Sequence, residues 1–176
     1  VQRAPAHIRP ALEKLFAEYR QALLYNADMP ESMSDLGIFL LAQGDLAGAE
    51  EALLHARRLS PGFLPALLNL SDVYRARNRD DLGEPLLQQA IQRYPESGYA
   101  HHMLGLLYVR TGRTTASVEQ FQLASQLAPE NPQYAFVHAV ALAETGRATQ
   151  AIQVLEALLA RFPGHVQARP ALEGYR

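Results

Sequence analysis

A proline recurs every 34 residues through most of the chain, and this period restricts the fold more than any other feature. The four prolines are Pro61, Pro95, Pro129 and Pro163. Such a period indicates a repeat architecture, in which each repeat is one supersecondary unit stacked on its neighbours. With each proline taken as position 32, the chain divides into four blocks: residues 30–63, 64–97, 98–131 and 132–165.

Small residues occupy positions 8 and 20 of every block. Two closely packed antiparallel helices require residues without bulk where their axes approach, so this pattern predicts one helix pair per block. Position 24 of each block is instead large and apolar, as Leu53 and Phe121 illustrate. The small residues are Gly37, Ser71, Gly105 and Ala139 at position 8, and Ala49, Gly83, Ser117 and Ala151 at position 20.

Position 15 of each block predicts a tight turn between the two helices. It is Gly44, Asn78, Gly112 and Gly146, and these residue types tolerate the left-handed backbone that follows a helix C-terminus. The recurring proline then ends the second helix, because proline cannot continue a helix. Pro85 lies near the start of the second helix expected in block two, which predicts a late helix start or a mild kink.

The blocks together carry a bulky residue, then Leu-Gly, Tyr, Ala, Phe, Ala and Pro at fixed positions. This combination resembles the tetratricopeptide repeat (TPR) family over residues 30–165. The resemblance implies an all-α fold, a right-handed superhelical solenoid of antiparallel helix pairs. Block three matches best, through Leu104, Gly105, Tyr108, Phe121, Ala124 and Pro129.

The sequence pattern indicates that the two ends are parts of further repeats. Residues 1–29 contain an amphipathic helix pattern over 10–25, interpreted as the second helix of a partial upstream repeat. Residues 166–176 are interpreted as the start of a truncated fifth repeat or a cap. Because the chain begins with Val1, we expect it to be part of a longer protein. We also expect exposed apolar surface at the C-terminal end, because solenoid repeats bury their apolar faces only against neighbours.

Composition narrows the classes of partner and chemistry. The net charge is −2, which gives no electrostatic reason to expect nucleic acid as a partner. No apolar run is long enough to cross a membrane, so a soluble chain without a membrane partner is expected, either cytoplasmic or periplasmic. The absence of cysteine excludes disulfides, thiolate metal sites and cysteine nucleophiles.

No motif for catalysis, for a cofactor or for a metal is visible. The sequence lacks a Gly-rich phosphate loop, an H-E-x-x-H motif and a nucleophile elbow, so a non-catalytic chain without a cofactor is expected. The adjacent His101 and His102 do not predict a metal site, because a helical metal-binding pair is expected four residues apart. We instead expect His101 to pack between helices and His102 to line a binding groove.

The resemblance implies where a partner binds. First helices of TPR proteins line a concave groove that holds peptides or partner helices. Arg75 and Arg110 could there grip backbone or carboxylate groups of a partner. The groove residues carried over to this sequence are Asn69, Asp72, Arg75, Tyr99, His102, Leu106, Arg110, Phe136 and Val140.

Two functions from different classes follow. The first is a protein-protein interaction scaffold that binds a peptide or a partner helix in its groove. The second is an accessory or assembly module of a larger enzyme or of a multihaem electron-transfer protein, because the first three blocks are similar to TPR regions attached to bacterial multihaem cytochromes. The chain itself has no C-x-x-C-H haem motif. A homodimer through exposed apolar ends is compatible with both functions.

Overall fold

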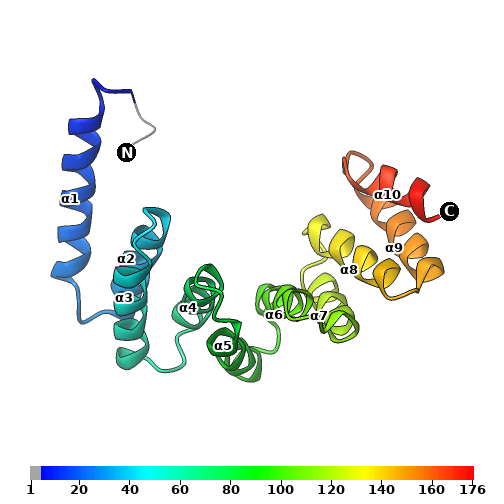
Figure 1. Cartoon of the computed structure of the whole chain (residues 1–176), viewed down its shortest axis with the longest axis horizontal. Helices are drawn as coiled ribbons and strands as arrows, with labels where there is room; N and C mark the ends of the chain where they lie inside the picture. The colour runs from blue at the N-terminus through cyan, green and yellow to red at the C-terminus, as the bar shows by residue number, and fades with distance from the viewer. Residues whose placement is uncertain (1–4) are drawn as a thin grey trace. The chain divides into compact units, whose positions relative to one another are not determined.

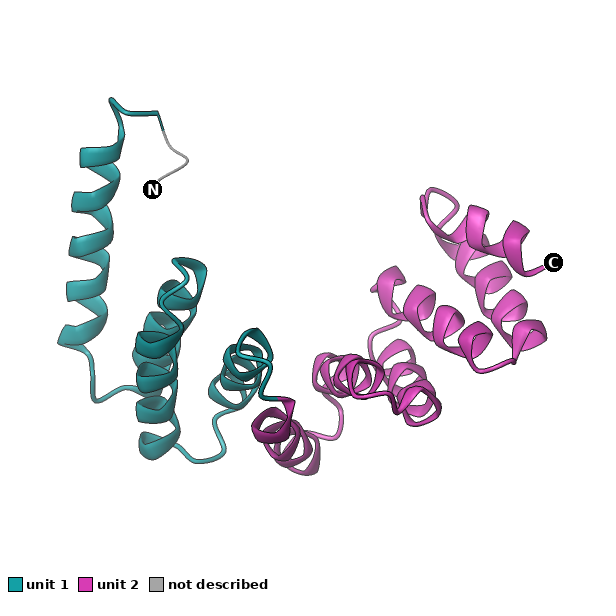
Figure 2. Ribbon diagram, viewed as in Figure 1, with its two compact units in different colours: residues 1–79 teal, residues 80–176 magenta. Residues whose placement is uncertain are grey.

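The computed structural model describes residues 5–176, which form ten α-helices and no strand (Figure 1). The chain divides into two compact units, residues 1–79 and residues 80–176 (Figure 2). This boundary falls inside the block predicted at 64–97, and the division into four blocks stays a prediction. None of the helices formed by the described residues is both long enough and apolar enough to cross a membrane.

Unit 1 contains four helices, of which α2 and α3 form a closely packed pair. Helix α4 packs against both, and α1 contacts α2 through an aromatic cluster. In that cluster the rings of Phe16 and Tyr19 meet the ring of Phe39 edge-on, with centroids 5.4 and 5.2 Å apart. The helices are α1 (Arg9–Tyr25), α2 (Pro30–Ala42), α3 (Leu46–Leu59) and α4 (Leu64–Ala76).

Unit 2 contains six helices, in which α6 pairs with α7 and α8 pairs with α9. One apolar cluster joins α7, α8, α9 and α10, and burial of each large side chain in it contributes about 1.5–3 kcal/mol. The helices are α5 (Asp80–Arg93), α6 (Gly98–Arg110), α7 (Thr114–Leu127), α8 (Pro132–Glu144), α9 (Ala148–Arg161) and α10 (Ala168–Tyr175).

The turns inside the blocks have the backbone that the sequence predicts. The φ angles at position 15 are 83° at Gly44, 57° at Asn78, 75° at Gly112 and 78° at Gly146. Asn78 is the one residue other than glycine with a positive φ among the described residues. The prediction of a left-handed residue after each first helix is therefore confirmed at all four positions.

In blocks one and three, the small residue at position 8 faces the large residue at position 24 of the same block. A Cβ atom added to Gly105 would lie 2.5 Å from Cε1 of Phe121, and one added to Gly37 would overlap the Leu53 side chain. The two helices of each of these pairs thus approach so closely that a single methyl group has no room. The predicted pattern of small and large residues is therefore explained by this close contact between the two helices.

Two expectations hold only in part. Helix α5 begins at Asp80, so the late start is wrong; Pro85 is its sixth residue, and the alternative of a mild kink stays a prediction. At the C-terminal end, the helix α10 buries Ala168 and Leu172 in the cluster shared with α9, so part of the apolar surface expected to be exposed there is covered, whereas Val166 is 85% exposed. Exposed apolar side chains also occur on α1, where they include Leu15, Leu24 and Tyr25.

Candidate functional site

One side of the first helices of unit 2 exposes large apolar side chains. Along α6 they are spaced seven and three residues apart, with Tyr99 48%, Leu106 38% and Val109 44% exposed. This spacing places them on one stripe of the helix. Helix α8 carries half-buried apolar residues at the corresponding positions of its block. We call the following six residues the α6–α8 face: Tyr99, His102, Leu106, Val109, Phe136 and Val140.

His102 joins the two helices of this face. Its ring stacks on Tyr134 of α8, with centroids 4.6 Å apart and an interplanar angle of 27°, and it lies 5.7 Å from the ring of Phe121. Its Nδ1 atom is buried and has no hydrogen-bond partner among the described residues. Burial lowers the pKa of His102, so the ring is neutral at neutral pH and behaves as part of an apolar surface.

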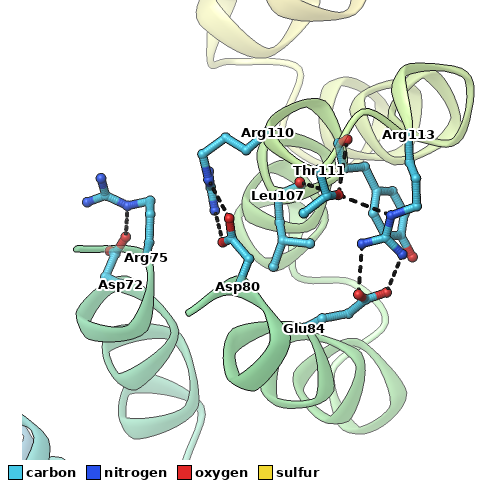
Figure 3. A network of polar contacts seen from close by, with 9 residues as sticks. Asp72, Arg75, Asp80, Glu84, Leu107, Arg110, Thr111 and Arg113 are labelled. Atoms are coloured by element: carbon cyan, nitrogen blue, oxygen red, sulfur yellow. Dashed lines mark hydrogen bonds and ion pairs between the residues drawn. The ribbon is translucent and has the colours of Figure 1, made fainter. Parts of the chain in front are cut away.

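Arg110 is predicted to grip a partner, which stays a prediction, and the structure shows that its guanidinium has a carboxylate partner within unit 2. Its guanidinium donates two hydrogen bonds, of 2.6 and 3.2 Å, to the carboxylate of Asp80 on α5 (Figure 3). Arg113 makes a matching pair with Glu84, with two hydrogen bonds of 2.8 Å (Figure 3). Because both arginines are bound by carboxylates of their own unit, the charge near α6 is neutralised internally.

The site residues predicted on α4 also have partners inside their unit. Arg75 donates to Asp72 at 2.9 Å (Figure 3), and the amide of Asn69 donates to the hydroxyl of Ser34 on α2 at 3.3 Å. Ser34 itself is buried. The nine predicted site residues thus fall into two sets, a polar set of three on α4 and a set of six on α6 and α8. Only the second set presents a mainly apolar surface.

His101 packs between helices, as the sequence predicts. The side chain is buried, with Nδ1 2.9 Å from Oε1 of Gln120 and Nε2 3.1 Å from the carbonyl oxygen of Pro95. Both ring nitrogens are therefore satisfied within unit 2. Across residues 5–176, no group of three or more histidines, aspartates or glutamates is arranged to hold a metal ion.

Sequence reasoning missed an open apolar pocket of about 590 Å³ beside the loop that joins α9 to α10. This loop spans residues 162–167, whereas the corresponding loops span only 60–63, 94–97 and 128–131. The longer loop follows from the late start of α10, which the 34-residue period does not reveal. The pocket is lined by Pro132, Arg161, Phe162, Pro163, Gly164, His165, Val166 and Gln167.

Solved structures with the same fold were found for most of the chain. One is MamA (41-end) from Desulfovibrio magneticus RS-1, 19% identical, with a TM-score of 0.69 over 88% of this chain and 97% of that chain. A second is YrrB, a TPR protein with an unusual peptide-binding site, 19% identical, with a TM-score of 0.71 over 93% and 84%. A third is a thermophilic TPR protein of Thermus thermophilus, 20% identical, with a TM-score of 0.71 over 91% and 88%. At these identities the likeness shows the fold alone.

No curated protein matches the chain. The expected similarity to TPR regions of multihaem cytochromes stays a prediction. The family model described as Tetratricopeptide repeat matches residues 17–62, 68–132 and 102–166, which together include most of the sequence. The all-α helix pairs, the positive φ angles between them and this match agree, and the chain belongs to the tetratricopeptide repeat family.

Proposed function

We propose that this chain is a non-catalytic protein-interaction scaffold and that a peptide or helix of its partner binds on the α6–α8 face. The observation that carries the proposal is the stripe of exposed Tyr99, Leu106 and Val109 on one side of α6. Single exposed apolar residues are common on protein surfaces, but a contiguous apolar surface is typical of interaction sites. Membership of a repeat family that presents extended binding surfaces supports the same reading.

The chemistry of the face indicates what it binds. Arg110 and Arg113 are occupied by Asp80 and Glu84, so binding energy comes mainly from burial of apolar area, at roughly 25 cal/mol per Å². A partner with apolar side chains on one side, either an amphipathic helix or an extended segment, would match the stripe. Tyr99 is the expected centre of the interface, because buried aromatic anchors dominate binding energies.

The test uses peptides selected for binding to the purified chain from a random display library. The variant L106D/V109D places two carboxylates on the stripe, at side chains that are already exposed and whose change leaves the core intact. Its matched control is L127D, because Leu127 is 40% exposed but lies on the second helix α7. We expect L106D/V109D to bind the selected peptides at least about tenfold more weakly than the wild type, and L127D to bind them with a Kd within about twofold of the wild-type value. Equal binding by all three proteins would refute the proposal.

A second candidate is self-association through α1. Helix α1 exposes apolar surface at Leu15, Leu24 and Tyr25 and at part of the Tyr19 side chain, whose ring also packs against Phe39. Pairing of two copies through this surface would bury it. Such pairing is compatible with either role, as a free scaffold or as an accessory module of a larger enzyme or electron-transfer protein.

A further inference from the structure

The pocket beside the α9–α10 loop is open to solvent and lined mainly by apolar groups. Its walls are formed by the rings of Pro132, Phe162 and Pro163 and by Val166, which is 85% exposed. Its volume of about 590 Å³ lies within the range of roughly 300–1,000 Å³ that is typical of ligand-binding clefts. An exposed valine among three rings leaves apolar area that a partner side chain would remove from water.

The charged side chain that lines this pocket is positive. Arg161 lines the pocket, and none of the other lining residues is acidic. Its guanidinium lies 5.2 Å from the centre of the Phe162 ring, and within residues 5–176 no carboxylate lies at ion-pair distance from it. This distinguishes Arg161 from Arg110 and Arg113, which are both engaged by carboxylates. A cation placed against apolar walls favours an anionic group beside the apolar occupant.

The pocket adjoins the α6–α8 face. The ring of His165, which lines the pocket, lies 5.3 Å from the ring of Phe136, which belongs to that face. Pro132, a second lining residue, is the first residue of the same helix as Phe136. A segment bound along the face could therefore extend into the pocket without leaving the surface of unit 2.

From these contacts we infer that the pocket receives a large aliphatic or aromatic side chain of the bound partner segment, directly beside an aspartate or glutamate that pairs with Arg161. The inference rests on the proposed function and specifies its partner as an acidic segment with an apolar anchor. The anchor fills the space between Pro132, Phe162 and Val166. The neighbouring carboxylate accepts up to two hydrogen bonds from the guanidinium, the geometry in which arginine binds carboxylates best.

The first experiment determines which peptide residues the pocket selects. A random peptide display library is selected separately on the wild-type chain, on Arg161→Glu and on Arg93→Glu. Arg93 is the matched control, because it lies in the last turn of α5, as Arg161 does in the last turn of α9, at the same position of its block. From the wild type and from Arg93→Glu we expect to select peptides in which Asp or Glu adjoins a large apolar residue. From Arg161→Glu we expect to select peptides in which lysine or arginine adjoins that apolar residue instead.

The second experiment measures affinity by calorimetry with the best wild-type peptide. Binding to Arg161→Glu is expected to weaken at least about tenfold, and exchange of the acidic residue of the peptide for lysine is expected to restore it. A third variant, Gly164→Trp, adds a large ring at a lining residue of the pocket, where a Cβ atom meets nothing within 4 Å. This variant is expected to lose the preference for an apolar anchor, at an unchanged midpoint of urea unfolding.

The outcomes separate this inference from the proposed function. If the selected peptides show no acidic–apolar pair, or bind Arg161→Glu as tightly as the wild type, the inference is wrong. Loss of binding on L106D/V109D would then still support the α6–α8 face. Equal weakening on Arg93→Glu and Arg161→Glu would also overturn the inference, because it would show a general effect of net charge. If none of these variants changes peptide binding, the inference and the proposed function both fail.

Discussion

The approach of α6 to α7 can be tested by adding one carbon atom. In Gly105→Ala the new Cβ would lie 2.5 Å from Cε1, 2.6 Å from Cδ1 and 3.0 Å from Cζ of the Phe121 ring. Ordinary contacts of this kind begin at 3.4 Å, so the ring would have to move away by about 0.9 Å (3.4 − 2.5). Phe121 is only 1% exposed and packs within the cluster of unit 2, so no free space receives it.

Two opposing contributions determine how much Gly105→Ala changes the free energy of unfolding. Overpacking a core costs about 1–3 kcal/mol, whereas replacing glycine by alanine inside a helix gains about 1 kcal/mol. The net expectation for Gly105→Ala is a loss of about 0–2 kcal/mol in the free energy of unfolding. Gly105→Leu adds three more carbon atoms at the same place and should lose a few kcal/mol. For a chain of this length each kcal/mol lowers Tm by about 2–4 °C.

The assay is urea unfolding followed by circular dichroism, with Gly174→Ala as the control. Gly174 lies in α10, and a Cβ atom there meets nothing within 4 Å. The same chemical change should therefore stabilise at Gly174, by up to about 1 kcal/mol, and destabilise at Gly105. Phe121→Leu should also cost less in the Gly105→Ala background than in the wild type, with a coupling of at least about 0.5 kcal/mol.

A result of the same sign at both glycines would refute this reasoning. If Gly105→Ala were as stabilising as Gly174→Ala, the close approach of α6 and α7 would not exist in solution. Strict additivity of Gly105→Ala and Phe121→Leu would equally show that the two residues do not touch. Either outcome would also undermine the physical reading of the small residues at position 8.

Three further predictions concern a turn, pH and self-association. Gly112→Ala should lose about 1–2 kcal/mol by urea unfolding, because Gly112 has φ 75° and alanine is strained there; no loss would refute the left-handed turn. Burial, and then the positive charge of Arg147, lower the pKa of His138 below its ordinary 6.5, so the unfolded chain binds the proton first as pH falls. Stability should therefore decrease from pH 7.5 to pH 5 and decrease less in His138→Asn; an identical slope in both would contradict the assignment. Leu15→Glu should reduce self-association measured by sedimentation velocity, and a wild-type chain that stays monomeric at every concentration would remove that candidate.

The helix pairs could be predicted from the sequence because the features that form them are local and recur with the period. Gly44, Gly112 and Gly146 mark turns by their own backbone freedom, and Asn78 tolerates the same conformation. The small-to-large contact of Gly105 with Phe121 also lies within one block. The start of α10 could not be predicted, because nothing in the pattern shows that Val166 and Gln167 stay outside the helix.

The candidate site was only partly predictable, and the reason is the length of its polar side chains. Position within the block predicts the helices on which Leu106 and Phe136 lie, α6 and α8, because these apolar side chains stay near their own helix. Arginine reaches much further: Arg110 finds Asp80, which lies 30 positions earlier in the sequence. The 34-residue period contains no information on which carboxylate such a side chain meets, so the ion pair of Arg110 with Asp80 could not be predicted.

These internal ion pairs determine what the surface can recognise. Exposed arginine–carboxylate pairs contribute little to stability, because water and salt screen them, so Arg110–Asp80 and Arg113–Glu84 do little to hold unit 2 together. Their larger effect is on binding, because they neutralise the charge beside the stripe of Tyr99 and Leu106. A partner must then gain its affinity from apolar burial, which gives little orientation since it has no direction. Arg161, which no carboxylate within residues 5–176 neutralises, is the group that could fix the direction in which a segment lies on the surface.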